Sequence, residues 1–542
     1  MNSALAEPLK TALVLPRLRL SWSAAVYLLI LAAAVLNTLY LFVSPLDLSP
    51  DEAHYWDWSR HLAWSYYSKG PFVAWLIRGS CELFGNTVFA VRLPAVLCST
   101  LMLVALDRLA RRTLGSAKLS FWLVAVVLTL PPISAGAVLT TIDAPFLCCW
   151  SWALVFVHRA IFENDDRSWT RAGIVLAVGT LTKYTMLAFP VLIGLFLIVD
   201  HSRRPTLFGC GFRRMTFLGC LGLIPILVWN ATHDWLGLWH LFGQAGLATG
   251  PKIGFKWYGL LDYLGGQFAF LVGYWFCVWL AAAWTFRPGR EANPHFAFLW
   301  WLSVPLVLMM LPFSLRVKVQ PNWPATAYLP GIVLAVAWLR RQFEGESKIY
   351  RRLVIACLAL GILASLTLTI VARFPRLALP LFAKLAAEPT DDQLAPVRNL
   401  DPTARLRGWR YLAGEVDKLR DLVRSEDGQE SLTGAMVWTL PGELGFYCEG
   451  NPQVYTFGVA LSDRFSQYDV WRPNPVADAQ AFCGRTFVYV GEKMPDMNAV
   501  FERCDGPYRV EYRENGVTVG GWKLWIARGY RGFPTSHKLS QY

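Results

Sequence analysis

The sequence predicts an all-α polytopic membrane domain over residues 1–373, followed by a small α+β domain over residues 374–542. Three observations lead to this fold class. The 542 residues are 55% hydrophobic and only 16% charged, and their mean hydropathy is +0.36, which is typical of membrane proteins. Many apolar runs are long enough to cross about 30 Å of hydrocarbon as a helix. After about residue 374 the charge rises and the long apolar runs stop.

About eleven membrane-spanning helices are expected. The first apolar run, residues 22–43, lacks a small-residue cleavage site and precedes many similar runs, so it is interpreted as a retained helix. A break is expected at Lys183, because one helix across it would turn the later basic clusters outward. The expected spans are 22–43, 87–107, 119–138, 143–161, 171–182, 184–200, 214–230, 263–285, 295–313, 323–339 and 351–373.

Most Lys and Arg residues lie in short clusters beside the apolar runs. The formal net charge is +13, but such clusters mark cytoplasmic loops and require no nucleic-acid partner. They predict a cell inner membrane protein with a cytoplasmic N-terminus and a periplasmic second domain. The loops 44–86, 139–142, 231–262 and 314–322 and the turn at 183 then face outward. Loop 44–86 contains apolar-faced pieces too short to span, which are expected to lie along the interface as helices.

The second domain is large enough to form its own core. Residues 414–425 have helical spacing, whereas 435–440, 454–457 and 486–490 have the composition of strands. Residues 508–526 are expected to form a hairpin that turns at Asn515-Gly516. This domain carries no catalytic motif of its own. Its cysteines, Cys448, Cys483 and Cys504, would allow one disulfide after export, and the sequence does not choose the pair.

An acidic pair, Asp51-Glu52, follows the first span directly. Carboxylates beside a bilayer need a reason, since charge is costly there. One interpretation is structural, because Ser49 and Asp51 are good N-cap residues for an interfacial helix that starts near Ala53. The other is catalytic, because adjacent carboxylates raise each other's pKa, which suits a base that works near neutral pH.

Asp143 occupies a similar position, in Thr141-Ile142-Asp143-Ala144-Pro145 at the outer mouth between the third and fourth spans. It is placed where an N-cap is favoured, with Pro145 in the first turn of the following helix. It also lies at the same depth and on the same side as Asp51. The sequence therefore allows either a cap or a shared site.

Four cationic residues also lie near the outer ends of spans: Lys69, Lys183, Arg316 and Lys318. Lys and Arg are usually enriched in cytoplasmic loops, so their presence on the outer side needs an explanation. Such side chains can also simply extend from a span to the membrane interface. Groups of this kind would hold a phosphate. The nearby Asn322-Trp323 offers an amide and an aromatic platform for a sugar, unless Trp323 only belongs to the aromatic belt.

Four histidines, His54, His61, His233 and His240, are expected on the same outer side. Their spacing matches no compact metal motif. No cofactor is required by any motif, but a divalent metal held by Asp51, Asp143 and His233 is an open alternative.

The chain resembles the GT-C superfamily of polyprenyl-phosphate-sugar glycosyltransferases. Within it, the resemblance is to the bacterial branch similar to protein O-mannosyltransferases and to lipid A aminoarabinose or galacturonic acid transferases. The motifs that carry it are Pro50-Asp51-Glu52-Ala53-His54-Tyr55-Trp56, Tyr67-Ser68-Lys69-Gly70-Pro71, Thr141-Ile142-Asp143-Ala144-Pro145, Thr182-Lys183-Tyr184 and Asn322-Trp323-Pro324. They are specific as a set and cover about residues 22–340.

The resemblance implies transfer of a sugar, with inversion, from a polyprenyl-phosphate carrier to a lipid, glycan or protein acceptor at the outer face of the membrane. No β-trefoil is inserted between spans, which argues against a protein acceptor. The implied catalytic residues are Asp51, Glu52 and Asp143, the donor phosphate would contact Lys69, Lys183, Arg316 and Lys318, and substrate would contact His54, Tyr55, Tyr67, Tyr184, Asn322 and Trp323.

Two other classes of protein compete with this interpretation: a lipid or sugar transporter (flippase), and a non-catalytic assembly protein that uses its outer domain for interactions. Transport predicts charged residues near the bilayer midplane and paired broken helices. Here the unusual charged residues gather at one face and loop 44–86 is elaborate. Both features favour chemistry at a lipid headgroup.

Overall fold

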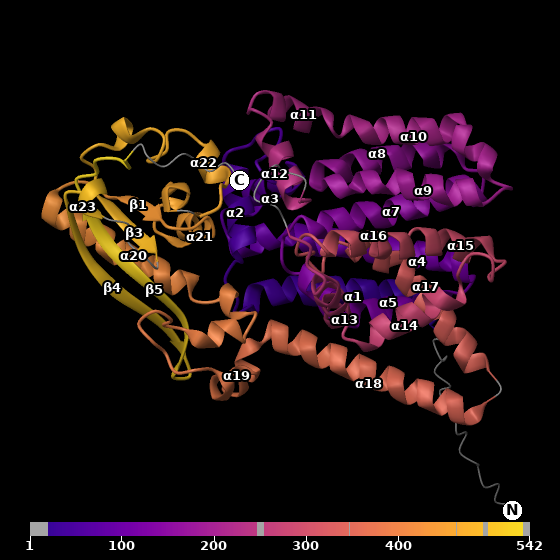
Figure 1. Ribbon diagram of the computed structural model, residues 1–542. Coiled ribbons are helices and arrows are strands. Elements are labelled where there is room, and N and C mark those ends of the chain that lie inside the picture. The colour runs from indigo at the N-terminus through magenta and orange to yellow at the C-terminus, as the bar shows by residue number, and fades with distance from the viewer. Residues whose placement is uncertain (1–19, 247–253, 346, 462, 492–496, 535–542) are drawn as a thin grey trace, which may run out of the picture.

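The computed structural model describes residues 20–246, 254–345, 347–461, 463–491 and 497–534. A bundle of long helices occupies one end of the molecule, and a sheet with its own helices occupies the other (Figure 1). The helices up to Arg373 are α1 (Trp22–Val43), α2 (Pro50–Arg60), α3 (Phe72–Phe84), α4 (Val88–Leu114), α5 (Ala117–Thr129), α6 (Pro131–Gly136), α7 (Asp143–Phe162), α8 (Asp166–Thr182), α9 (Ala188–Val199), α10 (Cys210–Leu221), α11 (Ile224–Ala231), α12 (Leu236–Gln244), α13 (Gly259–Phe270), α14 (Tyr274–Thr285), α15 (Pro294–Trp301), α16 (Val304–Ser314), α17 (Tyr328–Glu344) and α18 (Lys348–Arg373).

The helical bundle makes the chain a multi-pass membrane protein. Among the described residues, six helical segments are long and apolar enough to cross a membrane: α1, α4, α7, α10 with α11, α15 with α16, and α18. Each of the eleven expected spans falls on helical structure, but several helices, such as α5, are shorter than a full crossing. The number of crossings therefore stays a prediction. The expected break at Lys183 is present, since α8 ends at Thr182 and a 3₁₀ turn precedes α9.

The segment expected to span the membrane over 263–285 is not one continuous helix, because α13 and α14 meet at an angle of 105°. The break falls on Val272 and Gly273, whose φ angles of 56° and 62° cannot continue a right-handed helix. A side chain at position 273 would also meet the ring of Phe268, at 2.5 Å from its Cβ. The pair can supply one broken span or a re-entrant segment.

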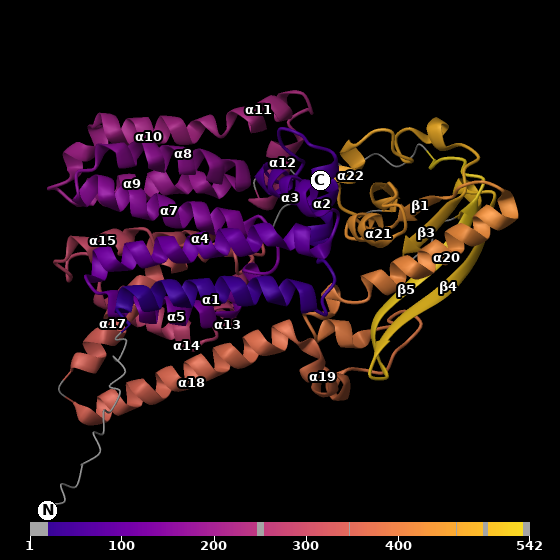
Figure 2. The same cartoon turned by 180° about the vertical axis from the view of Figure 1, so that it is seen from behind.

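Helices α2 and α3 lie between the bundle and the sheet (Figures 1 and 2). The hydroxyl of Ser49 accepts a hydrogen bond from the Glu52 backbone N–H, and the Glu52 carboxylate accepts one from the Ser49 N–H. This capping box starts α2 and satisfies two otherwise unpaired donors. The expectation that Asp51 caps this helix is therefore wrong, because Ser49 and Glu52 do so.

The C-terminal domain has a mixed five-stranded sheet with the strand order β2-β1-β3-β5-β4. Strand β1 is parallel to β2 and β3, whereas β5 is antiparallel to β3 and β4. The strands are β1 (Leu432–Ala435), β2 (Val454–Thr456), β3 (Phe487–Gly491), β4 (Arg503–Glu514) and β5 (Val517–Arg528), and the helices are α19 (Leu379–Leu385), α20 (Trp409–Asp427), α21 (Pro441–Tyr447), α22 (Gln467–Val470) and α23 (Met497–Val500).

The predicted hairpin is confirmed. Strands β4 and β5 are joined by Asn515 and Gly516, whose positive φ angles of 47° and 83° suit a tight two-residue turn. The strand expected over 435–440 is wrong, because β1 ends at Ala435 and the chain turns toward α21. This turn brings Trp438 to the cavity described below.

Helix α21 packs directly on α2 and so joins the C-terminal domain to the membrane domain. A Cβ at Gly442 would lie only 2.6 Å from the carbonyl carbon of Ala53 and 2.8 Å from the backbone nitrogen of His54. Two further bonds tie the same surfaces together: Tyr447 Oη accepts from the Leu48 N–H at 2.7 Å, and Asp47 Oδ2 accepts from the Trp409 N–H at 2.9 Å.

A Gly442→Ala substitution is expected to lower the thermal unfolding midpoint of the protein in detergent. The added methyl group meets backbone atoms that cannot rotate away, and such overpacking costs about 1–3 kcal/mol. Gly414→Ala in α20 is the matched control, because a Cβ there meets nothing within 4 Å. Equal midpoints for the two variants would contradict the close packing of α21 on α2.

Candidate active site

A cavity of about 620 Å³ lies where loops at one end of the membrane domain meet the C-terminal domain. Its walls come from α2, the loop before α3, the start of α7, the turn at Lys183, α12, the segment before α17 and three places in the C-terminal domain. The lining residues are Pro50, Asp51, His54, Tyr55, Trp58, Ser68, Lys69, Thr141, Ile142, Asp143, Lys183, His240, Gly243, Gln244, Val317, Lys318, Gln320, Asn322, Trp323, Arg405, Trp438 and Arg464.

Asp143 is held by two partners within this cavity. Lys183 Nζ lies 2.9 Å from Asp143 Oδ1, and Asn322 Nδ2 donates to Asp143 Oδ2 at 2.7 Å. The alternative that Asp143 is an N-cap is wrong, because Ile142 occupies that position and no side chain caps α7. Asp143 instead joins the fourth expected span to the turn at Lys183 and to the segment before α17.

Asp51, unlike Asp143, is not held by a neighbouring side chain in the described part of the chain. It is exposed to the cavity and forms no hydrogen bond or ion pair with another residue in the described part of the chain. The enclosing walls remove water and raise the pKa of Asp51 above the ordinary aspartate range. The charges of Arg405, Arg464 and Lys69 oppose this rise. Asp51 is therefore a carboxylate that is ready to accept a proton or to orient a polar group.

Lys69 is enclosed in the same cavity. Burial, followed by the charge of Lys183, lowers the pKa of Lys69 to about 8, although Asp143 and Asp51 oppose this fall. The neighbouring Gly70 fixes the loop, since a Cβ there would lie 2.0 Å from the carbonyl oxygen of Leu181. The loop with Lys69 is thus held beside the end of α8. An anion that enters the cavity would stabilise the charged form of Lys69.

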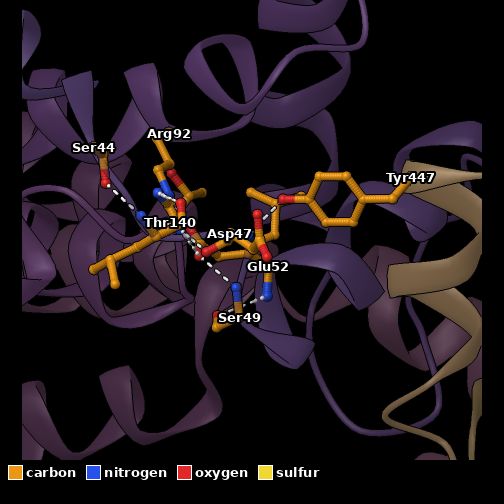
Figure 3. Close-up of polar contacts among 9 residues, drawn as sticks. Ser44, Asp47, Ser49, Glu52, Arg92, Thr140 and Tyr447 are labelled. Carbon is orange, nitrogen blue, oxygen red and sulfur yellow. Dashed lines mark hydrogen bonds and ion pairs between the residues drawn. The ribbon is translucent and has the colours of Figure 1, made fainter. Parts of the chain in front are cut away.

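Glu52 does not line the cavity. Its side chain points the other way and is fully buried against Arg92 of α4 (Figure 3). Arg92 Nε and Nη2 each donate to one carboxylate oxygen at 3.0 Å, and the backbone N–H groups of Ser49 and Thr140 also donate to Glu52. These contacts hold α2, α4 and the turn before α7 together, so the geometry gives Glu52 a structural place rather than the expected catalytic one.

The other expected site residues divide between the cavity and its surroundings. His54, Tyr55, Lys318, Asn322 and Trp323 line the cavity, whereas Arg316, Tyr67, Tyr184 and His233 do not. Burial lowers the pKa of His54 to about 3, so this imidazole is neutral. The backbone N–H of Tyr67 donates to Gln467 in the C-terminal domain at 2.7 Å. Tyr184 lines an adjoining groove.

The candidate metal set is not brought together. His233 stacks on Trp229 with ring centroids 4.2 Å apart, and its Nδ1 lies 2.8 Å from the Trp229 carbonyl oxygen. Within the described ranges, no group of three or more His, Cys, Asp or Glu side chains is placed to hold a metal ion.

The C-terminal domain contributes three cavity residues that were not anticipated from the sequence: Arg405, Trp438 and Arg464. Arg405 lies in a 3₁₀ turn before α20, Trp438 follows β1, and Arg464 precedes α22. No motif marks them, because only the docking of this domain on α2 brings them to the site.

Two apolar grooves adjoin the polar cavity. One, of about 280 Å³, shares Lys69, Lys183 and Trp323 with it and continues along Met309, Met310 and Phe313. The other, of about 250 Å³, shares Asp143 and Asn322 and continues between α4, α6, α7 and α17. Both are suited to hydrocarbon chains whose polar ends lie in the cavity.

The fold is similar to that of a solved membrane enzyme. ArnT from Cupriavidus metallidurans, solved bound to undecaprenyl phosphate, superposes with a TM-score of 0.59 at 18% identity, over 93% of this chain and 98% of that one. Residues 68–229 match the family model described as dolichyl-phosphate-mannose-protein mannosyltransferase.

Two curated relatives come from Rhizobium johnstonii. The chain is 30% identical over 322 residues to the lipid A galacturonosyltransferase RgtD, and this alignment covers 58% of the chain and 64% of the relative. It is 27% identical over 179 residues to the lipopolysaccharide core galacturonosyltransferase RgtA, which covers 33% and 36%. The matches thus span less than two thirds of either relative. The family model and both relatives are named for sugar transfer rather than transport, so the expected resemblance to GT-C glycosyltransferases is confirmed.

Proposed function

We propose that this protein is a membrane glycosyltransferase that moves a sugar from a polyprenyl-phosphate carrier to a lipid acceptor. The observation that carries the proposal is the cavity in which Asp51, Asp143, Lys69 and Lys183 meet beside an apolar groove. A phosphate on a long isoprenoid needs a cationic site next to an apolar channel. The names of the relatives favour lipid A as acceptor and a galacturonosyl group as cargo.

The reaction takes place, in this proposal, at the outer face of the cell inner membrane. The end of α17, which contains Arg340 and Arg341, and the start of α18 at Lys348 lie at the end of the bundle away from the sheet (Figure 1). Basic loops stay in the cytoplasm. This orientation puts the N-terminus in the cytoplasm and the 374–542 domain in the periplasm, and eleven crossings satisfy it.

Asp51 would act as the general base, or would orient an acceptor that is already ionised. The acceptor oxygen forms a bond to the anomeric carbon, the bond from that carbon to the phosphate oxygen breaks, and an acceptor hydroxyl proton passes to Asp51. Both oxygens of Asp143 are engaged by Lys183 and Asn322, so it is not available as a nucleophile. We infer a single displacement, in which the acceptor attacks the anomeric carbon directly and inverts this centre.

Lys69 and Lys183 would stabilise the leaving polyprenyl phosphate. The phosphodiester becomes a phosphomonoester as the sugar leaves, which adds negative charge beside these ammonium groups. The isoprenoid would lie in the groove that Lys69 and Lys183 share with Met309 and Phe313. Lys318, Asn322 and Trp323 would contact the sugar or its phosphate.

Mass spectrometry of transfer products tests the proposal. The full-length protein in nanodiscs is incubated with undecaprenyl-phosphate galacturonic acid and lipid A, and the products are compared with those of protein-free nanodiscs. The expected result is lipid A that is heavier by one galacturonosyl residue. Intact lipid A in the presence of donor that the protein binds would overturn the assigned reaction.

Lys69→Gln is expected to weaken undecaprenyl phosphate binding about 10- to 100-fold, since a hydrogen bond to a charged group contributes about 1.5–3 kcal/mol. The wild-type affinity should also depend on pH. Lys69 binds phosphate in its charged form, which is complete below a pKa of about 8 and is lost as the pH rises through that value. The dissociation constant should then rise about tenfold per pH unit above 8.

Lys69→Arg separates charge from titration, because its guanidinium stays protonated over this range. Its affinity is expected to be flat between pH 7 and 9.5. Lys418→Gln, on the exposed face of α20, is the control and should behave as wild type. A wild-type affinity that does not change over this range would contradict the assigned role of Lys69.

A further inference from the structure

The C-terminal domain contributes two arginines, Arg405 and Arg464, to the cavity. Neither Arg405 nor Arg464 forms a side-chain hydrogen bond or an ion pair with another residue in the described ranges, whereas neighbouring arginines of the same domain do. Arg407 is buried between Asp401 and Glu514, and Arg410 Nε lies 3.0 Å from Asp47 Oδ1.

Arg464 is nevertheless held in place. Its Cζ lies 3.9 Å from the centroid of the Trp438 ring, a stacking distance that restrains the guanidinium plane while leaving its N–H groups directed at other partners. Trp438 itself packs against His54 of α2, with ring centroids 5.4 Å apart. The guanidinium of Arg464 is therefore held by the Trp438 ring at one face, while its N–H groups stay free to bind an oxyanion.

The charges in the cavity also exceed what the donor needs. Five cationic side chains, Lys69, Lys183, Lys318, Arg405 and Arg464, share it with only two carboxylates, Asp51 and Asp143. The phosphodiester of the donor carries a single negative charge, so this group alone leaves most of the excess unneutralised. This excess of positive charge around one cavity favours a second anionic group in the bound complex.

The arginines lie near the acceptor side of the reaction. Arg405 and Arg464 line the same cavity as Asp51. Lys69 and Lys183 line the apolar groove assigned to the isoprenoid, whereas Arg405 and Arg464 do not. The two cationic pairs therefore serve different parts of the cavity.

We propose that Arg405 and Arg464, backed by Trp438, form a second oxyanion site that binds a phosphate group of the acceptor lipid and so directs its nucleophile toward Asp51. The inference rests on the proposed function. The same chemistry would also accept the carboxylate of a uronosyl group on the donor, and the experiment distinguishes the two sources.

Binding to the full-length protein in nanodiscs tests the site with three probes: phosphorylated lipid A, dephosphorylated lipid A and undecaprenyl phosphate. The wild type is expected to bind phosphorylated lipid A at least about tenfold more tightly than the dephosphorylated form, as expected for charge-assisted hydrogen bonds. Arg405→Gln/Arg464→Gln should abolish this preference and leave undecaprenyl phosphate binding within about threefold of wild type, because the lysines that hold that phosphate are intact.

Arg472→Gln is the matched control, because Arg472 is exposed in the same domain and pairs with Asp478 outside the cavity. In a second arm, undecaprenyl-phosphate galacturonic acid is compared with undecaprenyl-phosphate galactose. Loss of a preference for the uronosyl carrier in the double variant would support the oxyanion site and assign its ligand to the donor. The site is overturned if the wild type prefers neither phosphorylated lipid A nor the uronosyl carrier. It is also overturned if the double variant keeps whichever preference the wild type shows.

The transfer assay separates this inference from the proposed function. A wild type that transfers sugar, with arginine variants that bind every probe normally, would overturn only the oxyanion site. A wild type that transfers nothing would overturn the reaction, whatever the arginine variants bind.

Discussion

Replacement of Asp51 by Asn is expected to lower the turnover number of sugar transfer about 10²- to 10⁴-fold, the range that general acid–base catalysis contributes. The amide keeps the shape of the side chain but cannot take the acceptor proton. Because Asp51 is exposed to the cavity and has no hydrogen-bond partner in the described ranges, the substitution should leave the fold and the thermal midpoint unchanged.

The pH dependence of the wild type gives a second readout of the same role. Burial raises the pKa of Asp51, so activity should be complete above that pKa and should fall as the pH drops through it. The acid limb should therefore lie above the ordinary aspartate range. Asp391→Asn, an exposed surface substitution, should keep the wild-type profile. An Asp51→Asn variant with more than about a tenth of wild-type turnover would rule out the base, since the contribution would fall below the usual range.

The sequence predicted that Asp51, Lys69, Asp143 and Lys183 lie on one side of the membrane domain. Asp51 is in the first turn of α2 and Lys69 precedes α3, whereas Asp143 begins α7 and Lys183 follows α8, and all four line one cavity. Topology alone was enough to place them on one face. The structure adds the pairing of Asp143 with Lys183 and Asn322, which requires side-chain geometry.

The sequence could not separate Asp51 from Glu52. Successive residues of an α-helix point about 100° apart, so one of an adjacent pair can face a cavity while the other is buried. Which residue is buried depends on Arg92, forty positions away in the chain, and no local pattern connects it to Glu52. Arg405 and Arg464 were missed for a similar reason, because their place depends on the packing of Gly442 against Ala53.

Replacement of Glu52 by Ala is expected to destabilise the protein by about 3–5 kcal/mol, the cost of leaving one partner of a buried ion pair without its counter-charge. The side chains of Arg92 and Glu52 are 1% and 0% exposed, so water cannot solvate the remaining guanidinium. The backbone N–H groups of Ser49 and Thr140 lose their acceptors as well. The measurement is the thermal unfolding midpoint and the monodisperse fraction after size-exclusion chromatography in detergent.

Glu82→Ala provides the contrast that identifies burial as the cause. Glu82 pairs with Arg78 one turn away on α3, but both side chains are about half exposed, at 58% and 45%. Exposed pairs contribute about 0–1 kcal/mol, so this variant should unfold close to wild type. If Glu52→Ala were as stable as Glu82→Ala and only turnover fell, Glu52 would belong to the chemistry after all. Instability with loss of turnover in the Glu52 variant, beside a normal Glu82 variant, would place Glu52 in the framework that holds α2 and thereby aims Asp51 into the cavity.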